Sequence, residues 1–190
     1  MNPVIEAIRS RRSIRSYETR PVPREMLRTI IEAANHAPSG MNTQPWRFVV
    51  VEDLGLRKKL RDTAIPNTRK FLETSVKTSN PQRYEMIMKR YEELEDPIYY
   101  GAPAIVFVIG SGRHAAEACP LACGNMMLAA QSLGLGTCWV KFGSMVTDNP
   151  EIVKALGLKS DETIYGPVLV GYPKEIPEPP AKKDPAILWI

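Results

Sequence analysis

The chain has 190 residues, of which 44% are hydrophobic, so it can bury one substantial core and is expected to form a single domain over residues 1–190. The net charge of +4 does not by itself indicate a nucleic-acid partner, and no apolar run approaches the roughly 18 residues of a membrane helix. Three cysteines without paired ligand spacing argue against a disulfide framework and a zinc site. We therefore expect a cytoplasmic protein with no membrane segment.

The first third of the chain predicts helices on either side of one strand. A proline in its first turn indicates a short helix over 3–10, and an apolar stripe indicates a second helix over 23–37. The unbroken apolar run at 48–51 is typical of a central strand covered on both faces. Residues 53–62 are expected to be helical, whereas the weak periodicity of 63–80 predicts a loop or mobile cover.

The middle of the chain predicts a helix, a strand and a second helix. Residues 82–96 place apolar side chains on one helical face and charged ones on the other. The run at 102–110 is typical of a buried strand, and 121–133 is an almost wholly apolar helix. A helix with no polar face belongs in the middle of a core or in an interface.

The last third predicts two more strands around a short helix. Residues 134–140 read as a short strand, 149–158 as a helix with proline at its start and glycine at its end, and 163–172 as a last strand. The tail over 173–190 is rich in proline and ends in the apolar letters AILWI, which favours docking on another chain.

Spaced arginines follow the first predicted helix. Arg11, Arg12 and Arg15 surround Ser13 within a few residues. Guanidinium groups and a hydroxyl at this spacing can bind a phosphate through charge-assisted hydrogen bonds. A solvated basic surface is the alternative. A nucleic-acid site is disfavoured, because only one aromatic residue lies nearby.

A second candidate segment, APSGMNTQPW over 37–46, joins a helix to a strand with turn formers and amides. Such a junction can present backbone and side-chain donors to a ligand. The Gly-x-Gly-x-x-Ala pattern at 110–115 matches part of a dinucleotide fingerprint but lacks the acidic residue expected roughly 20 positions later, so a simple turn is favoured.

Other catalytic classes find little support. The chain has two histidines and no Gly-x-Ser-x-Gly elbow, which disfavours a hydrolase, and no His/Asp/Glu cluster suits a catalytic metal. Scarce acid–base groups favour a cofactor that carries its own redox chemistry, as a flavin does, and leave no catalytic residue to name beyond the flavin.

Five segments in order carry a family likeness: RRSIRSY, APSGMNTQPWRFVVV, GAPAIVFV, GNMMLAAQSLGLGTCW and GPVLVGYP. With them the chain resembles, from end to end, the nitroreductase family of FMN-dependent oxidoreductases. The resemblance implies an α+β, three-layer fold with a central mixed sheet flanked by helices. It also implies a homodimer with a long apolar interface helix and with FMN bound where the two subunits meet.

The resemblance assigns the phosphate of FMN to the arginine segment. It implies that Arg11 and Ser13 bind the phosphate, that Arg12 helps to shape the loop, and that Arg15 approaches the pyrimidine edge of the flavin. Many members have a further arginine after the GYP segment, where this chain offers Lys182 or Lys183 as a substitute. A lysine supplies a point charge without the guanidinium fork.

The remaining contacts that the resemblance implies come from two other segments. The partner subunit is expected to place against the ring the residues Pro38, Ser39 and Gly40. Asn42 is expected to bond toward the ribityl chain or ring, while Gln44 and Trp46 pin the loop to the core. The strand end expected beside the ring comprises Cys138, Trp139, Val140, Lys141 and Phe142.

The function that the resemblance implies is reduction of nitroaromatics, quinones or similar electron-poor compounds with NAD(P)H by a ping-pong mechanism. Alternatives are specialised flavin chemistry, such as reductive dehalogenation or flavin cleavage, and a non-catalytic FMN-binding module. The segment over about 62–98 gives no recognisable substrate signature.

Overall fold

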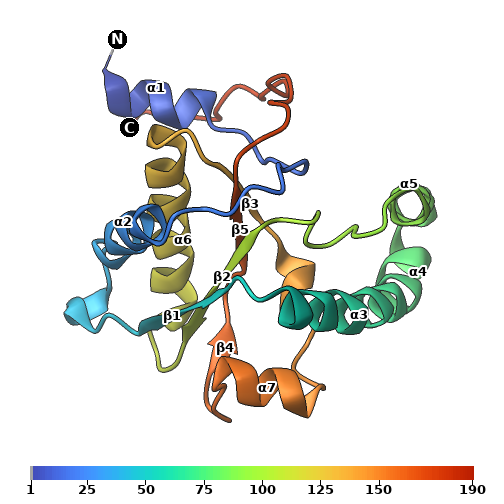
Figure 1. Ribbon diagram of the computed structural model, residues 1–190. Coiled ribbons are helices and arrows are strands. Elements are labelled where there is room, and N and C mark those ends of the chain that lie inside the picture. The colour runs from blue at the N-terminus through green and yellow to red at the C-terminus, as the bar shows by residue number, and fades with distance from the viewer. Residues whose placement is uncertain (1) are drawn as a thin grey trace.

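A computed structural model describes residues 2–190 of the chain, as a sheet with helices on both of its faces (Figure 1). The helices are α1 (Pro3–Ser10), α2 (Arg24–Asn35), α3 (Leu54–Phe71), α4 (Lys77–Ser79), α5 (Pro81–Glu93), α6 (Ala115–Ser132) and α7 (Pro150–Leu156), with a π turn η2 (Leu72–Val76) and the 3-10 turns η1 (Gly40–Asn42) and η3 (Lys141–Ser144). The strands are β1 (Trp46–Val51), β2 (Ala104–Gly110), β3 (Gly136–Trp139), β4 (Thr163–Ile164) and β5 (Val168–Gly171).

The strands form one sheet in the order β1-β2-β5-β3, with β4 also paired to β2. Every pair of strands among the described residues is antiparallel. The expected mixed character is limited to one parallel bridge, between Ser13 and Thr137. The expected α+β class is confirmed.

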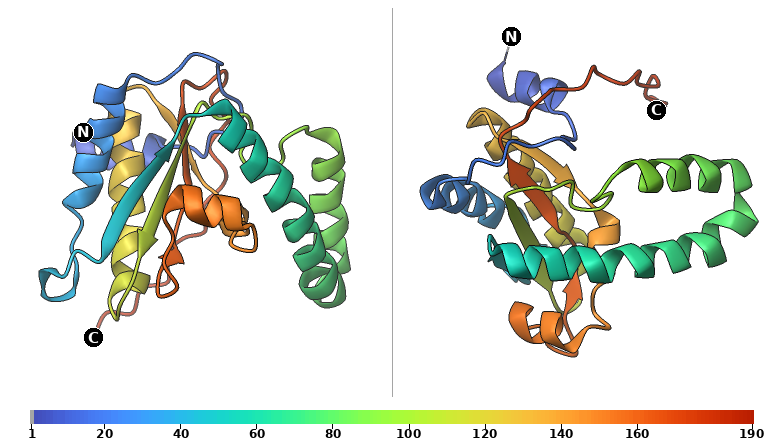
Figure 2. Two further views of the ribbon diagram at one scale, coloured as in Figure 1. Left: turned by 60° about the horizontal axis from the view of Figure 1, so that its bottom comes forward. Right: turned by 45° about the vertical axis from the view of Figure 1, so that its right-hand side comes forward.

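The sheet lies between two hydrophobic clusters, which makes the expected three layers. Along β2, Ile105, Phe107 and Ile109 belong to one cluster, whereas Val106 and Val108 belong to the other. Helices α2 and α6 cover one face, and α3 and α7 cover the other (Figure 2). Because side chains alternate across a strand, the continuous apolar run of β2 supplies both clusters.

The apolar run of β1 was expected to mark a central strand, and that expectation is wrong. Among the described residues β1 pairs only with β2, so it lies at an edge of the sheet. Its middle residues are partly exposed. Val49 still packs on one cluster, and Phe48 and Val50 pack on the other. The apolar run therefore indicates that both faces of β1 are packed against other residues. It does not indicate whether β1 has one neighbouring strand or two.

Residues 63–80 were expected to form a loop or mobile cover, but residues 63–79 are helical. Helix α3 continues through Pro66 to Phe71 and passes into the π turn of η2. Its buried stripe has a spacing of four residues and consists of Leu60, Ala64, Thr68 and Leu72, each 0% exposed. An alanine and a threonine weaken the hydrophobic signal of this stripe, although both face the core.

Two further boundaries differ from expectation. Helix α6 begins at Ala115, earlier than the expected 121, and it includes Pro120. The last predicted strand is divided into β4 and β5 around Pro167, which has no N–H to donate to a neighbouring strand. No helix within residues 2–190 is both long enough and apolar enough to cross a membrane.

A salt bridge holds β1 to the segment after α7. Both nitrogens Nε and Nη2 of Arg47 donate to the carboxylate of Glu162 at 2.7 Å, and Arg47 also donates to the carbonyls of Leu156 at 3.0 Å and Gly157 at 2.8 Å. The Glu162 side chain is only 8% exposed. These hydrogen bonds from Arg47 lower the pKa of Glu162 to about 2.

We expect Glu162→Gln to lower the free energy of unfolding by about 1.5 to 3 kcal/mol at pH 7, because the variant loses a doubly hydrogen-bonded ion pair. The folded-state pKa lies below the ordinary value of 4.5. The wild-type advantage is therefore fully present above pH 4.5 and is lost as the pH falls toward 2. Urea denaturation at fixed protein concentration measures it.

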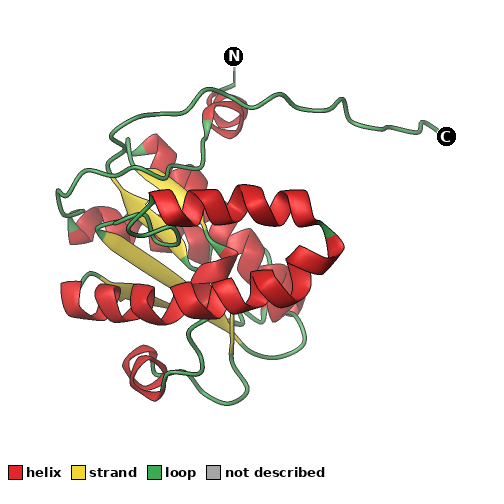
Figure 3. Cartoon of the chain, turned by 90° about the vertical axis from the view of Figure 1, so that its right-hand side faces the viewer, coloured by secondary structure: helices red, strands yellow, loops and turns green. Residues whose placement is uncertain are grey.

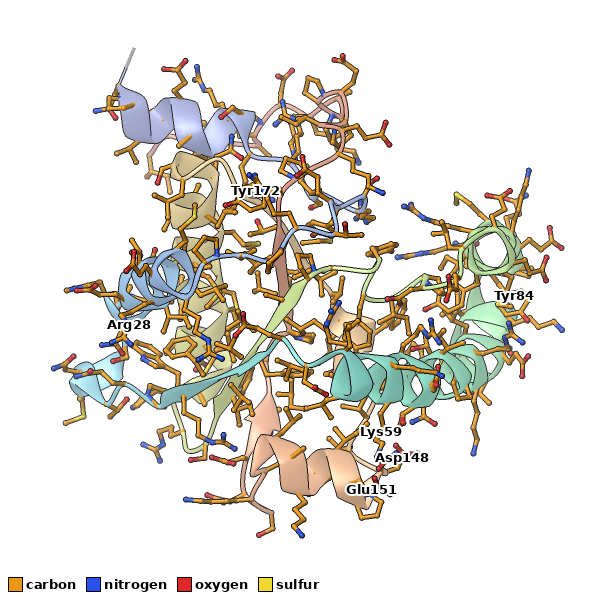
Figure 4. The ribbon with its side chains drawn as sticks, viewed as in Figure 1. Arg28, Lys59, Tyr84, Asp148, Glu151 and Tyr172 are labelled. Atoms are coloured by element: carbon orange, nitrogen blue, oxygen red, sulfur yellow. The ribbon has the colours of Figure 1, made fainter. Side chains whose placement is uncertain are left out.

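The control for this prediction is Glu151→Gln. Glu151 pairs with Lys59 at the surface, and Figure 4 shows the two side chains pointing toward each other. Exposed ion pairs contribute little to stability, so this variant is expected to unfold as the wild type does. Equal effects of the two substitutions would contradict a special role for the Arg47 pair.

Candidate functional site

The arginine segment lies along the free edge of β3. The backbone N–H of Ile14 donates to the carbonyl of Thr137 at 2.9 Å, next to the bridge between Ser13 and Thr137. Ile14 is buried against Gly136, where an added Cβ would lie 2.6 Å from Cγ1 of Ile14. A glycine is therefore required at 136 for the segment to dock.

Tyr17 fixes the other end of this segment. Its buried hydroxyl donates to the carbonyl of Ile14 at 2.7 Å, and its backbone forms a bridge with Pro173. The next residue, Glu18, donates its N–H to the carbonyl of Tyr172 at 2.9 Å. Burial raises the pKa of Tyr17, so the hydroxyl stays a donor at neutral pH. The segment is held at both ends, and the arginines project from a fixed backbone.

A cavity of about 600 Å³ lies between this segment and the C-terminal tail. The cationic and hydroxyl residues that line it include Arg11, Arg12, Ser13, Arg15 and Lys182. Glu178, also on the tail, is the carboxylate in its lining. Of the two candidate lysines, only Lys182 is among the lining residues, and Lys183 lies in the exposed tail.

Arg11 and Arg12 differ in how their guanidinium groups are satisfied. Atom Nη1 of Arg11 is buried and has no hydrogen-bond partner among residues 2–190. By contrast, Nη1 of Arg12 donates to the carbonyls of Arg9 at 2.7 Å and Arg11 at 2.8 Å. A buried donor without a partner is costly, so Arg11 is suited to an anion in the cavity, whereas Arg12 shapes the turn.

The second candidate segment forms a tight loop around η1. Met41, Asn42 and Gln44 adopt positive φ angles of 53°, 54° and 44°, which are rare for residues with a side chain. The N–H of Gln44 donates to Oγ of Ser39 at 3.0 Å, and its side chain donates to Oδ1 of Asn42 at 3.2 Å. Strained conformations of this kind gather at ligand-binding loops.

Two contacts attach this loop to the body of the chain. Nε1 of Trp46, which is buried, donates to Oδ1 of Asn35 at 2.9 Å. The ring of His114 packs on Gly40, where an added Cβ would lie 2.9 Å from the imidazole. Gln44 is exposed and bonds within the loop, so it does not pin the loop to the core as expected. Pro38, Ser39 and Gly40 line a small cavity of about 310 Å³ together with residues of α6 and His114.

The arginine segment and the loop over 38–44 lie in separate parts of the folded molecule (Figure 1). The segment is beside α1, and the loop follows α2 at the far end of the molecule. The two sets of candidate residues therefore cannot hold the same small ligand within one chain.

The five site residues expected at the end of β3 differ in burial and in the contacts that they make. Cys138 is buried, and Val140 and Phe142 are half-buried. Burial raises the pKa of the Cys138 thiol, while the positive charges of Arg15, Arg11 and Arg90 oppose this rise, so the thiol lies near the arginine segment.

Trp139 and Lys141 face elsewhere. Trp139 is 44% exposed and donates from Nε1 to the carbonyl of Tyr165 at 2.8 Å, so it is not a core residue. Lys141 is exposed and lines a separate cavity that it shares with Lys159 and Glu162.

Comparison with known proteins decides the family. The model of the nitroreductase family matches residues 8–172. The chain belongs to the nitroreductase family.

Three similar proteins illustrate the match. An iodotyrosine deiodinase of Thermotoga neapolitana is 30% identical, with 99% of this chain and 97% of that protein aligned. An NADH dehydrogenase of Thermus thermophilus is 29% identical over 94% of this chain and 92% of its own length. A crystal structure of a nitroreductase with bound FMN from Bacteroides fragilis superposes with a TM-score of 0.80 at 28% identity and covers 100% of both chains.

Tyr100 is a candidate residue that sequence reasoning missed. It has a positive φ of 53° and is half-buried. Burial raises its pKa, while the charges of Arg90 and Arg15 oppose the rise, so it lies at the same place as Cys138. The letters DPIYYG preceding β2 form a turn signal that could have drawn attention to it.

We expect Gly40→Ala to lower the free energy of unfolding by roughly 1 to 3 kcal/mol, because the new methyl group overlaps the His114 ring and one of them must move. Thermal denaturation of single and double variants measures the effect. Combining the change with His114→Ala removes the obstructing ring, so the double variant should be no less stable than His114→Ala alone. Additive losses would show that the two residues do not interact.

Proposed function

We propose that this protein is an FMN-dependent oxidoreductase that uses NAD(P)H to reduce nitroaromatics, quinones or similar electron-poor compounds. The observation that carries the proposal is the buried, partnerless Nη1 of Arg11 beside a cavity lined by cations. A phosphate monoester supplies the acceptor oxygens and negative charge that this arrangement lacks. Membership of the nitroreductase family supports FMN as the molecule that carries the phosphate.

The residues of this chain suit different parts of FMN. Arg11, Ser13 and Lys182 surround the cavity and would hold the phosphate, with Arg12 fixing the turn. Arg15, nearer to Cys138 and Tyr100, would lie at the ring and favour negative charge on it.

We further propose a homodimer in which each flavin site uses both chains. The separation of the loop over 38–44 from the arginine segment supports this arrangement, because a second copy can bring the loop to the site. Apolar side chains on α1 support it too: Val4, Ile5 and Ile8 are all largely exposed, and no residue of α1 is buried. The last part of the tail runs away from the body in Figure 3 and ends in exposed Trp189 and its neighbours.

FMN held by Arg11, Ser13 and Lys182 would supply the redox chemistry, which is hydride uptake from NAD(P)H and two-electron transfer to the electron acceptor. Neither histidine lies among the residues lining the phosphate cavity. The tasks left to the chain are therefore to bind FMN, to orient the substrates and to shield them from water. The absence of a complete dinucleotide fingerprint favours one open site that the two substrates occupy in turn, which is a ping-pong mechanism.

Reductive dehalogenation is a second candidate function. It is supported by the 30% identity to the iodotyrosine deiodinase of Thermotoga neapolitana over nearly the full length of both chains. Anaerobic incubation of the reduced protein with 3-iodotyrosine, followed by product analysis, tests it. Release of iodide would favour this candidate over the reduction of nitroaromatics.

The first prediction of the proposed function concerns the flavin itself. Purified protein, reconstituted with FMN if necessary, should show the flavin absorbance bands, and these should bleach under anaerobic titration with NADH or NADPH. Adding a nitroaromatic or a quinone should restore them. If the bands persist with both nucleotides, the protein is not an NAD(P)H-dependent reductase.

The second prediction concerns the phosphate contact. Arg11→Ala should weaken FMN binding by roughly 1.5 to 3 kcal/mol, measured by flavin fluorescence titration, because a charge-assisted hydrogen bond is lost. Arg28→Ala removes the same charge from the outer face of α2, where Figure 4 shows the side chain directed outward, and should leave the affinity unchanged. Equal affinities of all three proteins would remove Arg11 from the site.

A further inference from the structure

A turn held by one carboxylate precedes β2. Asp96 accepts the backbone N–H groups of Tyr99 at 2.8 Å, of Gly101 at 3.1 Å and of Ile98 at 3.3 Å. Its own carbonyl accepts the N–H of Tyr100 at 3.1 Å. Three backbone amides therefore hold the carboxylate of Asp96 in place, and these hydrogen bonds fix the backbone of the turn.

The two tyrosines of this turn have different tasks. Tyr99 is 2% exposed, and its hydroxyl donates to the carbonyl of Gly143 in η3 at 2.8 Å, which fastens the turn to the body of the chain. Tyr100 is held at a φ of 53°, and Gly101 follows at 63°. Positive φ at a residue as large as tyrosine is unfavourable by itself. The strain is maintained by Asp96 and Tyr99 and sets the position of the Tyr100 ring.

Two guanidinium groups flank that ring. Cζ of Arg90, on α5, lies 5.7 Å from the ring centroid of Tyr100. Arg15 lies close enough to Tyr100 for its charge to oppose the rise in pKa that burial causes. Both arginines are exposed, and neither has a carboxylate within 4 Å among residues 2–190. Neither guanidinium group is therefore engaged in an ion pair within the described chain.

We propose that Arg90 and Tyr100 form a subsite for an aromatic carboxylate, so that the protein prefers electron acceptors that carry an acid group on the ring to be reduced. This inference rests on the proposed function. The guanidinium group of Arg90 matches the two oxygens of a carboxylate, and the fixed ring of Tyr100 offers an aromatic surface beside it. Arg15 serves the flavin and adds positive charge, which leaves Arg90 to bind the substrate.

The test compares two ligands of nearly equal shape, 4-nitrobenzoate and neutral 4-nitrobenzamide. Their dissociation constants are measured from the absorbance change of oxidised, FMN-loaded protein at constant ionic strength. The wild type should bind the acid more tightly, and Arg90→Gln should reduce this preference about tenfold or more, since one charge-assisted contact is lost. Arg83→Gln removes the same charge from an exposed position on the same helix and should keep the preference.

Other results would overturn the inference. A wild type that binds the acid and the amide equally has no such subsite. An Arg90→Gln variant that keeps the preference for the acid but binds NADH or NADPH less tightly would assign the arginine to the nucleotide phosphates instead. Because binding is measured on oxidised protein without turnover, these results are independent of the proposed function, which fails separately if NAD(P)H does not bleach the flavin.

Discussion

The docking of the arginine segment on the edge of β3 is the contact on which the candidate site depends. Ile14 occupies the space that a side chain at 136 would fill, and a single hydrogen bond to Thr137 sets its register. Arginine side chains are long and flexible, so they can form a precise anion site only where the backbone beneath them is fixed. Ile14 and Tyr17 fix the backbone of the arginine segment because their side chains are buried in the core. The arginine side chains, which line the cavity, are then available to bind a ligand.

The same sheet that anchors this segment also positions the proposed substrate subsite. β2 occupies the middle of the sheet, and the turn that leads into it carries Tyr100. Tyr99 joins this turn to η3, directly after β3. The helices from α3 to α5 extend from the body and return toward the turn before β2 (Figure 2). Arg90, on α5, thereby comes to lie beside the ring of Tyr100. The polar and charged groups of the candidate site thus lie at the border of the hydrophobic core, where rigid strands end and charged side chains can still reach solvent.

The sequence was most informative where a long apolar run is also buried, as in β2 and in most of α6. Prediction from the sequence failed where buried residues are small or polar. Ala64 and Thr68 are buried in α3, but neither is a large apolar residue, so the helical periodicity of the buried stripe is weak in the sequence. The gathering of the arginines was predictable because they are neighbours in the chain. The arrival of Lys182 from the tail, and of Arg90 beside Tyr100, depends on long-range folding that no local pattern encodes.

The distance between the arginine segment and the loop over 38–44 has a consequence for inheritance. In a dimer with shared sites, each site combines the arginine segment of one copy with the loop of the other. If one copy has a defective arginine segment and the other a defective loop, both defects lie in the same site, and the second site is intact. Two defective alleles can then complement each other when expressed together. After gene duplication, each copy could lose a different half, and the pair would persist as an obligate heterodimer with a single working site.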